Sequence, residues 1–197
     1  MTRPAARPTN IFHIVGVVLH KSLDWEQLPD AQALQQARLR HRLRRADRYT
    51  SLCIAAADAL LEGVELLPAT ALITVSSFGP SETAFQTIED ILDVPAEEVS
   101  PTRFSHSVEN AACSYLGVAF GFHGPVFALA GFEQSTVENA NQLAQTILEQ
   151  GLAPSALVIN VVCASIVTAH AHEFYPQRFP HGVSERVRAW LYLTDDK

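Results

Sequence analysis

The sequence predicts an α/β fold on a mainly parallel sheet, and three observations support this prediction. Apolar segments of strand length alternate along the chain with segments of helical length. Most of the apolar segments are continuous, which is typical of strands buried on both faces. The chain has 197 residues, of which 48% are hydrophobic and 18% charged, enough for one globular core. We therefore expect one α/β domain in which helices cover both faces of a five-stranded mixed sheet.

Five segments are predicted as strands. The first four are rich in β-branched and apolar residues, and the fifth alternates as a half-exposed strand does. The predicted strands are residues 11–20, 71–78, 126–130, 155–162 and 186–194.

Helices are predicted between these strands. Asp30 can cap the first helix, and Gly151 can end the last one. The predicted helices are residues 31–61, 82–92, 107–120 and 135–150. A loop rich in proline, histidine and phenylalanine, residues 170–184, is expected to join the last two strands. Residues 1–10 are expected to form a flexible N-terminal arm, and residues 11–197 a single domain.

Composition and charge exclude several classes of protein. The net charge of −7 argues against a nucleic-acid-binding protein. Cys53, Cys113 and Cys163 are widely spaced and odd in number, which favours reduced thiols over disulfides or a zinc site. We find no signal peptide and no apolar run long enough to span a membrane, so a soluble cytoplasmic protein is expected. No metal and no cofactor is predicted.

Gln134 lies where a predicted strand turns sharply into a helix. A helix N-terminus in such a turn supplies N–H groups that lower a thiol pKa and bind an oxyanion. A carboxamide is neither a nucleophile nor a base, so this position has the setting of a covalent catalyst without its reactive atom. The simpler alternative is an ordinary polar residue in the first turn of a helix.

Three motifs together resemble the N-terminal half of a β-ketoacyl synthase of the thiolase fold. The first is the segment SPTRFSHSVENA at residues 100–111, and the second is Gly124-Pro125 before an apolar strand. The third is the helix with Ala140, Ala144 and Gly151. In such synthases the catalytic cysteine precedes small residues, two helix-facing alanines and a terminal glycine. Counting back from Gly151 places the cysteine position at residue 134, and counting forward from Pro125 places it at residue 133.

Glutamine in place of the cysteine resembles the chain-length factor of type II polyketide synthases, above all the small proteins of aryl polyene clusters. The resemblance implies a non-catalytic subunit that pairs with a full-length ketosynthase, which extends acyl chains on an acyl carrier protein. It also implies that a second half would supply two catalytic histidines. His170, His172 and His181 lack the expected surroundings, so we do not expect an enzyme that works alone.

The resemblance also implies which residues meet the partner. The residues expected at the acyl tunnel and subunit interface are Phe104, His106, Phe120, Phe122, Phe127, Phe132, Glu133 and Gln134. A basic run, with Arg40, Arg42, Arg44 and Arg45, is expected to contact the acidic carrier protein or the partner subunit. A solvated helix face and internal ion pairs are the alternatives for these arginines.

Other functions remain open at the level of sequence. The chain could be a malonyl decarboxylase that uses the Gln134 amide, or an acyltransferase that uses Cys113, although Cys113 more simply fits a packed core. A homodimeric acyl-binding scaffold is a third possibility, but half of such a fold should leave an apolar face that needs a cover.

Overall fold

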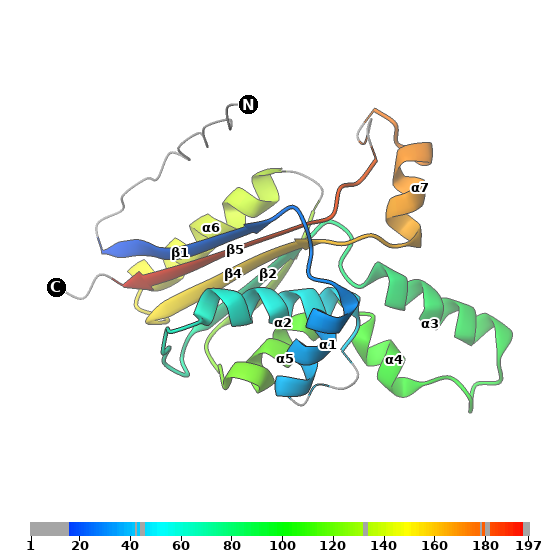
Figure 1. The fold of residues 1–197 in the computed structure, drawn as a ribbon, viewed down its shortest axis with the longest axis horizontal. Coiled ribbons are helices and arrows are strands. Elements are labelled where there is room, and N and C mark those ends of the chain that lie inside the picture. The colour runs from blue at the N-terminus through cyan, green and yellow to red at the C-terminus, as the bar shows by residue number, and fades with distance from the viewer. Residues whose placement is uncertain are drawn as a thin grey trace.

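One five-stranded sheet organises the molecule, in the order β1-β5-β4-β2-β3 (Figure 1). The computed structural model describes residues 16–41, 43, 46–131, 134–177, 179 and 182–194. The strands are β1 (Val17–Trp25), β2 (Ala71–Ser76), β3 (Val126–Ala130), β4 (Ser155–Val162) and β5 (Arg186–Thr194). Strand β2 pairs in parallel with β3 and β4, whereas β5 pairs antiparallel with β4 and β1. The mixed five-stranded sheet is confirmed, and its parallel part is confined to three strands.

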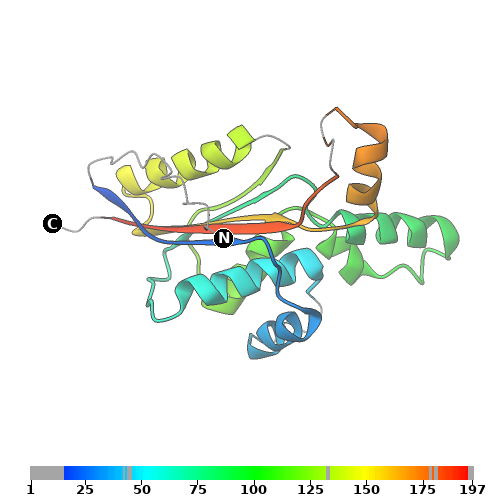
Figure 2. The same cartoon turned by 45° about the horizontal axis from the view of Figure 1, so that its top comes forward.

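Helices cover both faces of the sheet, as predicted. Figure 2 shows α6 (Gln134–Glu149) on one face and α2 (Arg48–Leu61) on the other, with α1 (Ala31–Arg40) outside α2. Helix α5 (Ala111–Phe120) lies beside α2 and contacts β2. The three remaining helices, α3 (Ser81–Asp93), α4 (Pro101–His106) and α7 (Ile166–Phe174), extend beyond the end of the sheet.

Each face of the sheet has its own apolar core. One core packs α1, α2 and α5 against the sheet, and the other packs α6 against it. Helix α6 places Val137, Ala140 and Ala144 in its core and exposes only polar side chains. The outward face of α6 is therefore polar. The uncovered apolar face expected for half of such a fold does not lie on this helix.

Two N-terminal elements differ from the sequence prediction. The first strand lies further along the chain, because the residues from Val17 to Trp25 pair with β5; residues 11–15 lie outside the described part. The single helix predicted over residues 31–61 is two helices. The side chain of Asp47 accepts a hydrogen bond from the Thr50 amide, 2.8 Å, and so caps a new helix there. The predicted arm, residues 1–10, also lies outside the described part.

Two later elements also differ from prediction. A short helix, α4, begins at Pro101 with Ser100 as its cap, and α5 begins only at Ala111. The segment predicted as a loop contains most of α7. The side chains of Ser165 and Thr168 form a reciprocal capping box at its start.

Candidate functional site

Gln134 is the first residue of α6 and follows the carboxyl end of the parallel strand β3. Ligands of open α/β sheets generally bind at the carboxyl ends of the strands. Gly131 follows β3, and its amide donates to the Ser76 carbonyl of β2, 3.1 Å. A Cβ at this glycine would lie 2.3 Å from Thr136 Oγ1, so any side chain here would require Thr136 to move.

Gln134 is tied to the sheet by Arg188. The guanidinium of Arg188, on β5, donates to Gln134 Oε1 at 3.3 Å and to Asn160 Oδ1 at 3.1 and 3.3 Å. It also lies over the ring of Trp190, 5.7 Å from the centroid. Burial lowers the pKa of Arg188. The turn therefore holds a cation and two carboxamides, whose chemistry is hydrogen bonding rather than nucleophilic attack.

The three cysteines are buried thiols. Cys113 Sγ lies 3.2 Å from Thr74 Oγ1 and 3.5 Å from the Phe127 carbonyl oxygen. Burial raises the pKa of Cys113, of Cys53 and of Cys163, the last to about 12. Since the thiolate is the nucleophile, these surroundings disfavour covalent catalysis at all three.

Strand β3 forms an exposed edge of the sheet within the described residues. It pairs with β2 on one side only, and its side chains include Val126, 49% exposed, and Phe127, 37% exposed. Natural proteins usually protect an apolar edge strand by pairing or covering it. This edge is therefore a candidate surface for association.

Phe104 and His106 lie on α4, away from the sheet. The Phe104 side chain is 60% exposed. The His106 ring packs edge-on against Tyr115 of α5, with Nε2 2.5 Å from the tyrosine hydroxyl oxygen. His106 thus has a partner within its own chain, whereas Phe104 is available for contact with another.

Phe120 and Phe122 lie at the opposite end of β3 from Gln134, because they precede this strand and Gln134 follows it. Their rings stack, with centroids 5.9 Å apart, and Phe120 also packs against His41. Phe122 is only 7% exposed and belongs to the core around α2. The structure therefore separates these two phenylalanines from the Gln134 turn.

Of the predicted basic contacts, the structure describes Arg40, the last residue of α1. The Arg40 guanidinium pairs with Asp58 at 2.6 Å, and Nε2 of His41 lies 2.6 Å from the same carboxylate. The predicted contacts Arg42, Arg44 and Arg45 lie outside the described residues, as do Phe132, Glu133 and His181. The ion pair with Asp58 thus offsets part of the positive charge that Arg40 would present to a partner.

The remaining candidate histidines are on α7. His170 Nδ1 lies 2.8 Å from the Ile166 carbonyl oxygen, and His172 Nδ1 lies 2.6 Å from that of Phe179. Among the described residues no three metal-ligating side chains come together. In the same part of the chain, no helix has the length and apolar character needed to cross a membrane.

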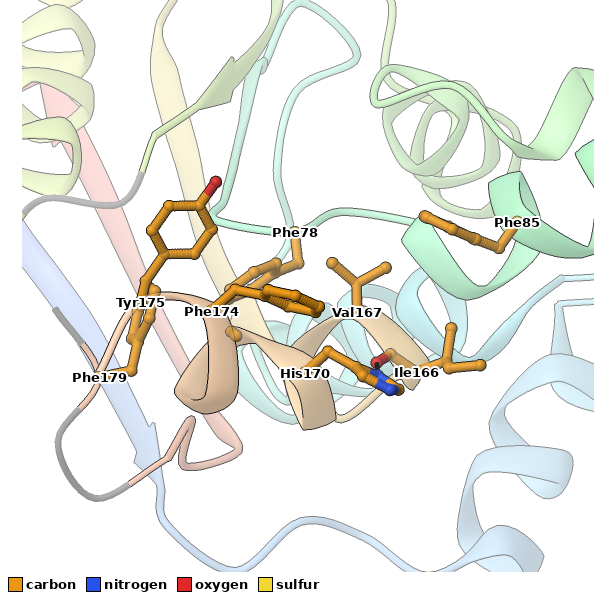
Figure 3. Close-up of a pocket in the computed structure, with 9 residues that line it drawn as sticks. Phe78, Phe85, Ile166, Val167, His170, Phe174, Tyr175 and Phe179 are labelled. Carbon is orange, nitrogen blue, oxygen red and sulfur yellow. Dashed lines mark hydrogen bonds between the residues drawn. The ribbon is translucent and has the colours of Figure 1, made fainter. Parts of the chain in front are cut away.

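An apolar groove that sequence reasoning missed lies between α3 and α7. It encloses about 600 Å³, and Figure 3 shows its aromatic walls. Its lining residues are Phe78, Phe85, Ile166, Val167, His170, Ala171, Phe174, Tyr175 and Phe179. The helical spacing of Ile166, His170 and Phe174 was the available signal, but a loop was predicted from His170 onward and no element at Ile166.

Comparison with known proteins identifies the family. The profile of the β-ketoacyl synthase N-terminal domain matches residues 22–184. The chain therefore belongs to the β-ketoacyl synthase N-terminal domain family. No curated protein matches the sequence.

Similar solved structures share the fold. A chain from the ketosynthase ApeO in complex with its chain length factor ApeC, from Xenorhabdus doucetiae, aligns with a TM-score of 0.67 at 15% identity, over 91% of this chain and 79% of that one. The ishigamide ketosynthase/chain length factor aligns with a TM-score of 0.66 at 21% identity, over 82% of this chain and 48% of that one. A variant of OleA from Xanthomonas campestris aligns with a TM-score of 0.54 at 13% identity, over 91% of this chain and 58% of that one. The chain thus spans only about half of the ishigamide and OleA chains.

Proposed function

We propose that this protein is a non-catalytic, chain-length-factor-like subunit that pairs with a full-length ketosynthase through the edge of β3. The observation that carries this proposal is the edge itself, which presents Val126 and Phe127 on a strand that pairs on one side only within the described residues. A second strand at this edge would satisfy the backbone and cover the apolar side chains. Two of the similar structures are described as ketosynthase and chain length factor together, which supports this choice of partner.

The chemistry of the Gln134 turn and of the thiols supports a non-catalytic role. The turn carries the Gln134 carboxamide, and the three thiols are buried with raised pKa values. The acyltransferase alternative requires Cys113 to ionise in a site that disfavours the thiolate. The ketosynthase partner would then supply the chemistry, while this subunit would limit the length of the acyl chain.

Carrier-protein binding is a separate part of the proposal. Arg40 is mostly exposed even though it pairs with Asp58, and the basic run is the densest on an acidic chain. An acyl carrier protein is acidic, so this run would attract it. Arg40→Glu should weaken carrier binding and leave subunit pairing unchanged.

Co-expression with a full-length ketosynthase tests the main proposal. We expect a one-to-one complex by size-exclusion chromatography, with the acyl adduct found by intact mass only on the larger chain. Phe127→Asp should dissociate the pair, because it places a charge at a desolvated interface. Val118→Asp, at an exposed position on α5, is the matched control. Stable pairing of the Phe127→Asp protein, or an acyl adduct on this subunit, would refute the proposal.

A further inference from the structure

Helix α3 turns its apolar side chains to solvent and its threonines to the protein. Thr83 and Thr87 are its buried side chains, and Thr83 Oγ1 donates to Asp47 Oδ2 at 3.0 Å. Phe85, Ile88 and Ile91 follow one another at intervals of three residues, and all are exposed. Amphipathic helices normally bury such a stripe, so this orientation indicates a surface made for contact.

Helices α3 and α7 meet at their starts and then diverge (Figure 1). Ser81 Oγ donates to Ser165 Oγ at 3.0 Å, and the Ile166 amide donates to Glu82 Oε2 at 2.9 Å. Beyond this junction Phe85 faces the apolar side of α7 across the groove, as Figure 3 shows. The groove therefore has fixed walls at one end and an open apolar interior.

The charge along this surface is one-sided. Residues 81–102 include six carboxylates and no lysine, arginine or histidine. These carboxylates are Glu82, Glu89, Asp90, Asp93, Glu97 and Glu98. Asp90 pairs with Arg103, but Glu89, Asp93, Glu97 and Glu98 are exposed. On α7, exposed Glu173 lies beside Phe174, and His170 and His172 are exposed on the same helix; Arg178, beyond the helix, falls outside the described residues.

We propose that the groove between α3 and α7 binds an amphipathic helix of a partner protein that carries apolar side chains on one face and lysine or arginine beside them. The apolar face would enter the cavity of about 600 Å³, and the cations would face the carboxylates of α3. An acidic carrier protein would be repelled here. This surface is distinct from the edge of β3, so the protein would have separate sites for two partners.

A pair of synthetic peptides tests this proposal. One is a fluorescein-labelled amphipathic helix with leucine on one face and lysine on the other, and its match has glutamate in place of lysine. Fluorescence anisotropy is measured as the full chain is added to each peptide. We expect saturable binding of the lysine peptide and none of the glutamate peptide. Binding should weaken as the salt concentration rises. Equal binding of the glutamate peptide, or no binding of either, would overturn the proposal.

Substitutions in the groove between α3 and α7 test where the peptide binds. Phe85→Ser and Phe174→Ser should each raise the peptide Kd about tenfold or more, since both remove apolar anchors. Glu89→Lys combined with Asp93→Lys should weaken binding of the lysine peptide and reduce the salt dependence. The matched controls are Leu67→Ser for exposed apolar area, and Glu138→Lys with Glu149→Lys on α6 for charge. Circular dichroism melts confirm that each variant folds.

Two other ligands of the groove, a small apolar molecule and a second copy of this chain, would give different results. Binding of a small apolar dye that Phe85→Ser abolishes, without any peptide binding, would mean a small-molecule site and overturn the proposal. A dimer that the same variant dissociates in light scattering would mean a second copy of this chain and overturn it too. Phe127→Asp should leave peptide binding intact, which separates this test from the test of ketosynthase pairing.

Discussion

Arg188 donates a hydrogen bond to the side-chain oxygen of Gln134, 3.3 Å away, although 54 residues separate them in sequence. A guanidinium can only donate, so the amide oxygen must face it and the amide nitrogen must face elsewhere. The same guanidinium holds Asn160 of β4. The start of α6 is thereby fastened to two strands of the sheet.

Arg188→Ala should destabilise the protein much more than Gln134→Ala. Removing the guanidinium leaves the buried Oδ1 of Asn160 without this donor, which costs about 1–3 kcal/mol of unfolding free energy. Gln134 is exposed, so its loss should change stability by about 0.5 kcal/mol or less. Urea unfolding of both variants checks the difference, and equal losses would contradict the prediction.

Gln134→Cys should create a reactive thiol but no synthase. The new thiol would lie at the N-terminus of a 16-residue helix beside Arg188, and both would lower its pKa. Iodoacetamide should therefore modify residue 134 ahead of the three buried cysteines, as peptide mass spectrometry would show. Without a partner, the purified variant should form no condensation product. Any such product would show that this chain supplies the remaining catalytic groups itself.

Four of the phenylalanines expected at the acyl tunnel are candidates to limit its length, and they should separate into two pairs. Phe104→Ala and Phe127→Ala change exposed side chains and should lengthen the product of the reconstituted pair, since a smaller side chain opens a pocket. Phe122→Ala instead empties a core position and should cost about 3–5 kcal/mol of stability. Phe120→Ala should act in the same direction. Product analysis by mass spectrometry, with thermal melts, distinguishes the pairs; unchanged product length in all four variants would exclude a gating role.

Glu109→Gln should change how stability depends on pH. Burial raises the pKa of Glu109 in the folded protein, so between the unfolded and folded pKa values the folded state binds more protons. Stability from this group is therefore present at low pH and lost as pH rises through that window. The variant should gain Tm relative to the parent as the pH rises from about 4 to about 7. A constant difference in Tm across this range would argue against a stability cost from ionisation of Glu109.

The strands of the sheet were largely predictable from local sequence. Continuous apolar runs predicted β3 and β4 with their observed bounds, and alternation predicted β5. In β4 the continuous run corresponds to burial on both faces, whereas the run in β3 is exposed or half-buried because this strand lies at the edge of the sheet. The helix carrying Ala140 and Ala144 was predictable for the same reason, because its small and apolar residues share one face.

The errors occurred where capping decided the structure. Asp47 begins a second helix inside a segment that hydrophobic periodicity treats as continuous. Ser165 and Thr168 begin α7 just before residues 170–184, whose prolines and histidines suggested a loop, and the helix continues into that segment as far as Phe174. Both caps were visible as residue types, but a cap acts only when the neighbouring chain presents its amides correctly.

Local pattern predicted the mixed α/β sheet, and the resemblance carried by three motifs predicted the family and the significance of the carboxamide at residue 134. The order of the strands and the bond from Arg188 to Gln134 came only from the packed fold. The same packing separated Phe122 from the candidate gate and joined α3 to α7 around an apolar groove. These relationships join residues far apart in the chain, and no local periodicity records which distant surfaces pack together.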